Sequence, residues 1–227
     1  MTPRICVSIL PKNMQEASML IKKAEESKAD LIEIRLDFLE ANASLKDLVQ
    51  KKKTPLIATR KLTSERGFFS GTESERQQSL LNAAQSGFEY VDVDLSSPSL
   101  QETIVKLKQL GAKPIVSYHK FDGTLRRAAM ERVLEQEIAG GANVCKIVTS
   151  AKKMEDNLAL LDFVASQSGK TKLVCFCMGE AGKVSRLLSP MFGAFFTFAS
   201  LEQGDETSPG QMTIGEMQTI YDCLGAP

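Results

Sequence analysis

Two residues with reactive nitrogen atoms lie at unusual places in this sequence. Lys146 is in the apolar run Val144-Cys-Lys-Ile-Val148, and His119, the single histidine of the chain, ends the run Ser117-Tyr-His119. A lysine that is buried beside other cations is neutral often enough to attack a carbonyl carbon and form a Schiff base. A histidine titrates near neutral pH and can transfer the protons that such a reaction needs. The pair therefore indicates covalent catalysis by an amine.

Each of these residues also has an ordinary structural explanation. A lysine at a strand end can lie along apolar surface and keep its ammonium group in water. A single histidine is more often a hydrogen-bonded structural residue, and Glu33 and Arg35 can form a structural ion pair. The structural explanation becomes weaker when the positions are considered together, because Glu33 can orient His119 while Lys146 acts as the nucleophile.

Short apolar segments alternate with amphipathic ones along the chain, which indicates strands that alternate with helices. We predict strands at Ile5–Leu10, Leu31–Asp37, Leu56–Arg60, Tyr90–Leu95, Pro114–His119, Val144–Thr149, Leu173–Met178 and Phe195–Ser200. We predict helices at Gln15–Lys28, Ser99–Leu110, Leu125–Ala139, Lys153–Gln167 and Met212–Leu224.

This order of elements predicts an α/β fold, a (β/α)₈ TIM barrel that forms a single catalytic domain over residues 1–227. The alternative is a doubly wound open sheet, which usually has a glycine-rich turn after its first strand, where this chain has Leu10-Pro-Lys-Asn-Met14. In a barrel, catalytic groups lie at the C-terminal ends of the strands. We therefore expect one face to collect Ser8, Glu33, Arg35, Asp37, Arg60, His119, Lys146, Arg186 and Gln211.

Composition narrows the classes of partner and compartment. The chain has 28 Lys+Arg and 28 Asp+Glu in 227 residues, so no net charge favours nucleic acid or a membrane surface, and we expect neither as a partner. A single histidine excludes a metal site with two histidine ligands. Five cysteines without C-x-x-C spacing favour a reduced, cytoplasmic compartment. The N-terminal apolar run is too short for a signal peptide, and no segment is long enough to cross a bilayer.

One further segment could bind an anion. Met178-Gly-Glu-Ala-Gly-Lys-Val-Ser-Arg186 follows the seventh predicted strand, where barrels often bind anions on backbone N–H groups. The anion could be a phosphate, or a carboxylate held by Arg186, and the segment could also be an ordinary turn. These alternatives stay open at this point.

An ordered set of short motifs resembles the type I 3-dehydroquinase family, whose members form a Schiff base in the shikimate pathway. The motifs cover nearly the whole chain: Glu33-Ile-Arg-Leu-Asp37, Ala58-Thr-Arg60, Ser117-Tyr-His119, Cys145-Lys-Ile147, Met178-Gly-Glu-Ala-Gly-Lys-Val-Ser-Arg186, Thr197-Phe198 and Ser208-Pro-Gly-Gln211. Each motif is weak, but their order along the chain is specific. The chain departs from the family pattern at Glu65-Arg-Gly67, usually Glu-Gly-Gly, and at Thr207, usually serine.

The resemblance implies a reaction and a role for each matching residue. Lys146 would form an imine with the C3 carbonyl of 3-dehydroquinate, His119 would act as general acid and base, and Glu33 would orient His119. The product would be 3-dehydroshikimate, and neither a metal nor a cofactor is needed. Ser8, Arg35, Arg60, Arg186, Thr207 and Gln211 would bind the substrate, and Met178 and Phe198 would line the pocket.

Two other functions would use the same residues. A Schiff-base aldolase, or another phosphate-binding barrel lyase, would use the same lysine with a phosphate at Met178–Arg186. A barrel without catalytic function should have lost the Lys146, His119 and Glu33 set, which this chain retains. We also expect Leu201–Gln211 to act as a lid, and a homodimer is the default expectation for such an enzyme.

Overall fold

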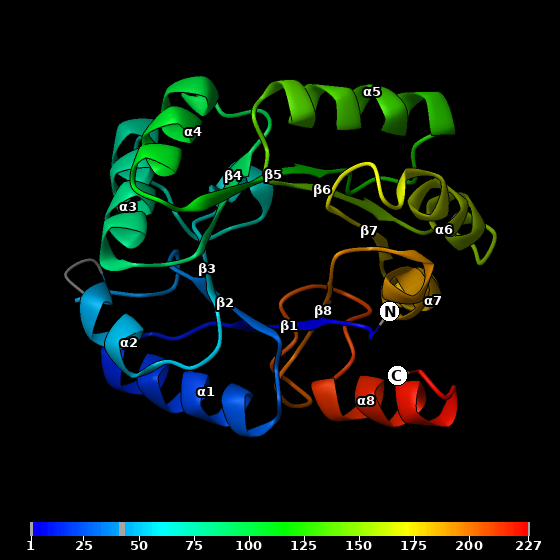
Figure 1. The fold of residues 1–227 in the computed structure, drawn as a ribbon, viewed down its shortest axis with the longest axis horizontal. Coiled ribbons are helices and arrows are strands. Elements are labelled where there is room, and N and C mark those ends of the chain that lie inside the picture. The colour runs from blue at the N-terminus through cyan, green and yellow to red at the C-terminus, as the bar shows by residue number, and fades with distance from the viewer. Residues whose placement is uncertain (1, 41–43, 227) are drawn as a thin grey trace.

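The computed structural model describes residues 2–40 and 44–226, and these form a barrel of parallel strands surrounded by helices (Figure 1). The strands are β1 (Ile5–Ile9), β2 (Leu31–Arg35), β3 (Leu56–Thr59), β4 (Tyr90–Asp94), β5 (Lys113–His119), β6 (Val144–Ser150), β7 (Leu173–Met178) and β8 (Thr197–Ala199). Their hydrogen-bonded order is β7-β6-β5-β4-β3-β2-β1-β8. The amide of Phe195, just before β8, donates to the carbonyl of Leu173 in β7 at 2.8 Å, so the barrel is nearly closed. The predicted (β/α)₈ barrel is confirmed, whereas the predicted domain limits include residues 1, 41–43 and 227, which lie outside the described residues.

The helices cover the outside of the barrel, and none in the described part of the chain is long and apolar enough to span a membrane. They are α1 (Met14–Glu26), α2 (Leu45–Lys51), α3 (Glu73–Ser86), α4 (Leu100–Gln109), α5 (Arg127–Ala139), α6 (Asp156–Gln167), α7 (Lys183–Leu188) and α8 (Ile214–Cys223). The sequence-based prediction gave no bounds for α2, α3 or α7. Two of these are short, and α3 buries Arg76 among alanines and leucines, so it has no continuous apolar stripe.

A polar layer lies above an apolar layer inside the barrel. The apolar layer includes Cys6, Leu31, Ile57, Tyr90, Ile115 and Val144. Side chains two positions apart on a strand point to the same face, so the next interior residue on each strand lies one layer closer to the C-terminal ends. Those residues are Ser8, Glu33, Thr59, Asp92, Ser117 and Lys146, all of them buried. The interior of the barrel is therefore apolar at the lower of these two layers and polar at the layer nearer the C-terminal ends of the strands.

Glu137 on α5 is an ionisable side chain with no role in that site. It is fully buried, and both of its carboxylate oxygens lack a hydrogen-bond partner among the described residues. Burial raises the pKa of Glu137 well above its usual range. The folded state therefore keeps this carboxyl protonated at pH values at which the unfolded chain ionises it.

We expect Glu137→Gln to stabilise the protein as pH rises. Because the folded pKa lies above the unfolded one, the protonated carboxyl contributes fully below the unfolded pKa, and this contribution is lost as pH rises through the folded pKa. Replacement should raise the free energy of unfolding by about 1–3 kcal/mol at neutral pH, with a smaller gain near pH 4. Urea unfolding across this range measures the effect, and Glu135→Gln, an exposed position on the same helix, is the control. An equal gain at both ends of the range would contradict the prediction.

Candidate active site

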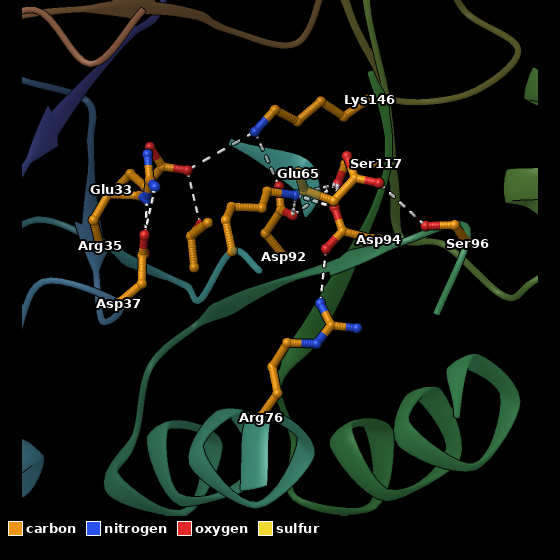
Figure 2. Close-up of polar contacts among 12 residues, drawn as sticks. Glu33, Arg35, Asp37, Glu65, Arg76, Asp92, Asp94, Ser96, Ser117 and Lys146 are labelled. Carbon is orange, nitrogen blue, oxygen red and sulfur yellow. Dashed lines mark hydrogen bonds and ion pairs between the residues drawn. The ribbon is translucent and has the colours of Figure 1, made fainter. Parts of the chain in front are cut away.

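A single pocket opens at the C-terminal ends of the strands and collects most of the residues that the sequence analysis selected. Those that line it are Ser8, Glu33, Arg35, His119, Lys146, Met178, Arg186, Phe198, Thr207 and Gln211. The pocket also contains residues that the sequence analysis did not assign to it: Thr59, Lys61, Glu65, Arg66, Phe121, Val148, Phe176, Ser208 and Pro209. Figure 2 shows the polar contacts at its base.

Lys146 extends from β6 into the centre of the pocket. Its Nζ donates to Asp92 Oδ2 at 2.9 Å and lies 3.8 Å from Glu33 Oε1 (Figure 2). The ammonium group also lies 4.5 Å from the ring centre of Phe198. The sequence analysis expected cations around this lysine, and that expectation is wrong for its closest partners, which are carboxylates. Asp92 and Glu33 instead provide negative charge beside the nitrogen.

Lys61 is a second lysine in the pocket, and its contacts make it a poor nucleophile. Its Nζ donates to Asp92 Oδ1 at 2.8 Å and to Ser117 Oγ at 2.9 Å, and it also donates to Asp94. Three acceptors occupy the three donors of an ammonium group. Although burial opposes the charged form, Asp92 and Asp94 together raise the pKa of Lys61 above its usual value. Lys61 Nζ thus donates three hydrogen bonds, whereas Lys146 Nζ donates one, so Lys146 is the better candidate for the nucleophile.

Asp92 connects the two lysines. Its carboxylate accepts hydrogen bonds from Lys146 and Lys61 on different oxygens, and Ser117 Oγ donates to it at 2.8 Å. Burial alone would raise the pKa of Asp92, but the two ammonium groups outweigh burial and hold it well below the usual range. Asp94 has a similar position one layer higher, where Arg76 Nη1 donates to it at 2.7 Å. Asp92 is therefore a permanent negative charge directly beside Lys146.

His119 ends β5 and lines the same pocket as Lys146. Burial lowers the pKa of His119 well below its ordinary 6.5, and the nearby charges of Lys61 and Lys146 lower it further, against the opposing effect of Asp92. The imidazole is therefore neutral at pH 7 and able to accept a proton. Its ring lies parallel to that of Phe121, with 6.0 Å between the ring centres and 8° between the planes.

The carboxylates nearest to His119 differ from the predicted one. One ligand atom each of His119, Glu65 and Asp94 lie within 4.8 Å of one another. Glu33 has other partners: Thr59 Oγ1 donates to it at 2.8 Å, and Ser8 Oγ also donates to it. Among the described residues no hydrogen bond or ion pair joins Glu33 to His119. Glu33 therefore lies beside Lys146 and not in the orienting contact with His119 that the sequence analysis expected. Glu65 and Asp94 are the carboxylates near His119, with no hydrogen bond to it among the described residues.

Glu65, Asp94 and His119 are residue types that bind metal ions, but Asp94 already accepts hydrogen bonds from other side chains. Asp94 accepts hydrogen bonds from both Lys61 and Arg76. Burial, followed by the charge of Asp94, raises the pKa of Glu65, whose Oε1 accepts a hydrogen bond from Ser96 at 3.4 Å. Because two cations already hold Asp94, this group is poorly suited to bind a metal ion.

Arg60 does not line the pocket, which corrects its predicted substrate contact. Its Nη1 donates to Ser79 on α3 at 2.7 Å, and its guanidinium group lies 4.1 Å from the ring centre of Phe69. The reason is strand alternation: Thr59 points inward to Glu33, so the next residue points outward. Lys61 then follows Thr59 on the inward face.

Arg186 is a buried cation without a carboxylate partner among the described residues. It is 1% exposed, and its Nη2 donates to Ser208 Oγ at 2.9 Å. The guanidinium group lies 4.4 Å from the ring centre of Phe176, and its Nε has no hydrogen-bond partner within residues 2–40 and 44–226. Burial lowers the pKa of Arg186 to about 9. Such a group is ready to bind an anion that reaches the pocket.

The loop that carries Thr207 and Gln211 reaches this arginine across the pocket. Gly210 has φ 74°, and a Cβ there would lie 2.1 Å from the carbonyl oxygen of Gly179, so only glycine allows the two loops to touch. The amide and hydroxyl of Thr207 donate to Gln211 Oε1 at 2.7 and 3.1 Å. Gln211 Nε2 is buried, has no partner in the described part of the chain, and can donate to a ligand. The lid motion expected of this loop stays a prediction.

Arg35 also lines the pocket, but its charge is already balanced. Its Nε and Nη2 donate to the two carboxylate oxygens of Asp37 at 2.9 and 2.6 Å. Asp37 Oδ2 accepts a further hydrogen bond from the amide of Phe68 at 3.0 Å, which connects β2 to the loop after β3. The pair therefore fixes the shape of the pocket wall as well as offering a guanidinium edge.

Comparison with known proteins identifies the family of this chain. Residues 5–226 match the type I 3-dehydroquinase family. A curated relative, a 3-dehydroquinate dehydratase of Dehalococcoides mccartyi, is 36% identical over 96% of this chain and 95% of its own length. The crystal structure of the 3-dehydroquinate dehydratase of Aquifex aeolicus is 28% identical, covers 97% of this chain and 98% of its own, and superposes with a TM-score of 0.80. That of Geobacillus kaustophilus is 24% identical and shares the fold, with a TM-score of 0.88, over 98% of this chain and 91% of its own.

Proposed function

The chain belongs to the type I 3-dehydroquinase family, and we propose that it removes water from 3-dehydroquinate to give 3-dehydroshikimate in the shikimate pathway, through an imine on Lys146. The observation that carries this proposal is that Lys146, His119 and Arg186 line the same pocket. An amine, a neutral base and an anion receptor are the groups that this reaction requires.

The first step joins Lys146 to the substrate ketone. The neutral imidazole of His119 takes one proton from the Lys146 ammonium group, and the free amine attacks C3. A second N–H proton moves to the former carbonyl oxygen, and this hydroxyl leaves as water with the proton that the imidazolium returns. The ammonium form thus becomes a protonated imine without net change in charge. Asp92, 2.9 Å from the nitrogen, and Glu33 both stabilise this positive charge. The three hydrogen bonds of Lys61 keep it out of this role.

The second step removes the proton at C2. The neutral imidazole of His119 accepts that proton, and the C–H electron pair moves into the iminium group to form an enamine. The enamine then expels the C1 hydroxyl, which takes the proton back from the imidazolium and leaves as water. The C1–C2 double bond forms, water hydrolyses the imine, and Lys146 is free again. The net change is the loss of one water molecule.

The remaining residues position the substrate and the base. We assign the substrate carboxylate to Arg186 and Ser208, and the ring hydroxyls to Ser8, Arg35 and Gln211. Thr207 acts through Gln211, because its hydroxyl donates to the side chain of that residue. Glu65 and Asp94 orient His119, the role that the sequence analysis gave to Glu33.

Family membership does not support the alternatives of a Schiff-base aldolase or another phosphate-binding barrel lyase. The anion at Arg186 is accordingly a carboxylate. That the enzyme works without a metal or cofactor, in the cytoplasm, as a homodimer and without nucleic acid stays a prediction.

The proposal is tested by borohydride reduction in the presence of 3-dehydroquinate, followed by peptide mass mapping. We expect the purified chain to convert 3-dehydroquinate to 3-dehydroshikimate and, on reduction, to carry one substrate-derived mass on the peptide that contains Lys146. Turnover without any adduct would overturn the imine mechanism and leave the dehydratase assignment intact. No turnover at all would overturn the assignment itself.

A further inference from the structure

Arg66, in the loop after β3, has a backbone conformation that side chains rarely adopt. Its φ is 58°, in the left-handed region that favours glycine. The residue lines the mouth of the pocket while its side chain remains exposed to solvent. A side chain held in an unfavourable backbone conformation at the edge of a site is a candidate for a functional role.

The neighbouring residues enforce this conformation. The amide of Arg66 donates to the carbonyl of Thr63 at 3.1 Å, and the amide of Gly67 donates to that of Leu62 at 2.8 Å. A Cβ at position 67 would lie 2.1 Å from the carbonyl oxygen of Lys61, so the turn must continue through glycine. The amide of Phe68 then donates to Asp37. The loop is thus fixed on both sides of Arg66.

The side chain of Arg66 lies over the ring of Phe121, which neighbours His119. Its guanidinium carbon lies 4.2 Å from the ring centre of Phe121. On the same ring, His119 stacks at 6.0 Å with nearly parallel planes. The loops after β3 and β5 therefore meet through one cation and two rings at the pocket mouth.

The charge of Arg66 is also available to a ligand. Among the described residues it forms no ion pair, whereas the other cations of the pocket wall, Arg35 and Lys61, are paired with carboxylates. Arg186 is the second cation without such a partner, and it lies at depth rather than at the rim. An approaching anion therefore meets Arg66 before it reaches Arg186.

We propose that Arg66 is a substrate-capturing residue, whose exposed guanidinium group attracts the carboxylate-bearing substrate to the pocket mouth. This inference rests on the proposed function. Exposed charges at the rim of a site act mainly on the rate of encounter and on its salt dependence. Because Arg186 holds the bound carboxylate, Arg66 contributes to kcat/KM rather than to kcat.

The test compares Arg66→Gly and Arg66→Lys with the wild-type chain over a range of ionic strength. We expect Arg66→Gly to keep kcat within about twofold and to lower kcat/KM about fivefold at low ionic strength, with the difference disappearing at high salt. Its melting temperature should be equal or higher, because glycine adopts this φ without strain. Arg66→Lys should retain the salt dependence. Lys108→Gln, at an exposed position on α4, is the control for loss of one positive charge.

Each outcome separates this inference from the proposed function. If the wild-type chain turns over 3-dehydroquinate and Arg66→Gly has the same kcat/KM and salt dependence, the inference is overturned and the function stands. A fall in kcat together with a lower melting temperature would also overturn it, because that pattern indicates a structural role. If the wild-type chain does not turn over 3-dehydroquinate, the function fails and this inference fails with it.

Discussion

Lys146→Met is expected to lower kcat by about four orders of magnitude or more and to remove the borohydride-trapped adduct, since no other amine in the pocket is free to replace it. The variant should remain folded. Asp92 keeps Lys61 and Ser117 as donors, and Glu33 keeps Ser8 and Thr59. The loss is therefore chemical, and the melting temperature, measured beside kcat and the mass map, should change little.

Lys61→Arg is the matched control for this experiment. It removes the other primary amine of the pocket but keeps a cation beside Asp92 and Asp94, whose charges would otherwise be left buried without a partner. We expect the adduct to remain on Lys146 in this variant. An adduct on Lys61 in Lys146→Met, or turnover retained by that variant, would contradict the assignment of the nucleophile.

The contrast between the two lysines could not be predicted from the sequence. Lys146 is conspicuous because apolar residues flank it in a strand, whereas Lys61 follows Arg60 just after a strand end, where a charged residue is unremarkable. The alternation that turns Arg60 outward and Lys61 inward depends on which residue of β3 first faces the barrel interior. If the first inward-facing residue of β3 is misplaced by one position, Arg60 is predicted to point inward and Lys61 outward, the reverse of what the structure shows.

The fold itself followed from the pattern of apolar segments, because eight strands at barrel spacing leave few other architectures. Strand boundaries were close, and β7 matched at both ends, Leu173 and Met178. The sequence analysis did not select Asp92 and Asp94 on β4, although the same kind of pattern marks them. Tyr90-Val-Asp-Val-Asp94 places two carboxylates on one face of an otherwise apolar strand, the same pattern that pointed to Glu33 and Arg35 on β2.

Contacts across the barrel were the part that the sequence could not supply. The choice between Glu33 and Glu65 as the partner of His119 depends on the path of the loop after β3, which Gly67 and the left-handed turn at Arg66 determine. The short contact between Gly179 and Gly210 likewise joins loops that are about thirty residues apart in the chain. Packing between distant loops determines which charged side chains come into contact. The alternation of residues within one strand determines only which side chains lie on the same face.

His119→Ala is expected to lower kcat by about 10²–10⁴-fold, because the variant loses the group that moves the proton from C2 to the departing hydroxyl. Imine formation on Lys146 should persist, so borohydride should still trap the substrate, although more slowly. This split between trapping and turnover distinguishes a proton-transfer role from a structural one. Full turnover by the variant would show that another group is the base.

The pH dependence of the wild-type chain gives an independent check on the same residue. Since burial and the charges of Lys61 and Lys146 depress the pKa of His119, the acidic limb of kcat/KM should lie below 6.5, the ordinary value for histidine. Activity is lost as pH falls through the depressed pKa, because the imidazole then carries a proton and cannot accept another. Glu65→Gln should move this limb further down, since it removes a negative charge close to His119. Glu33→Gln should instead impair trapping, because Glu33 lies beside Lys146 and not beside the histidine. The opposite pattern would restore Glu33 as the residue that orients the base.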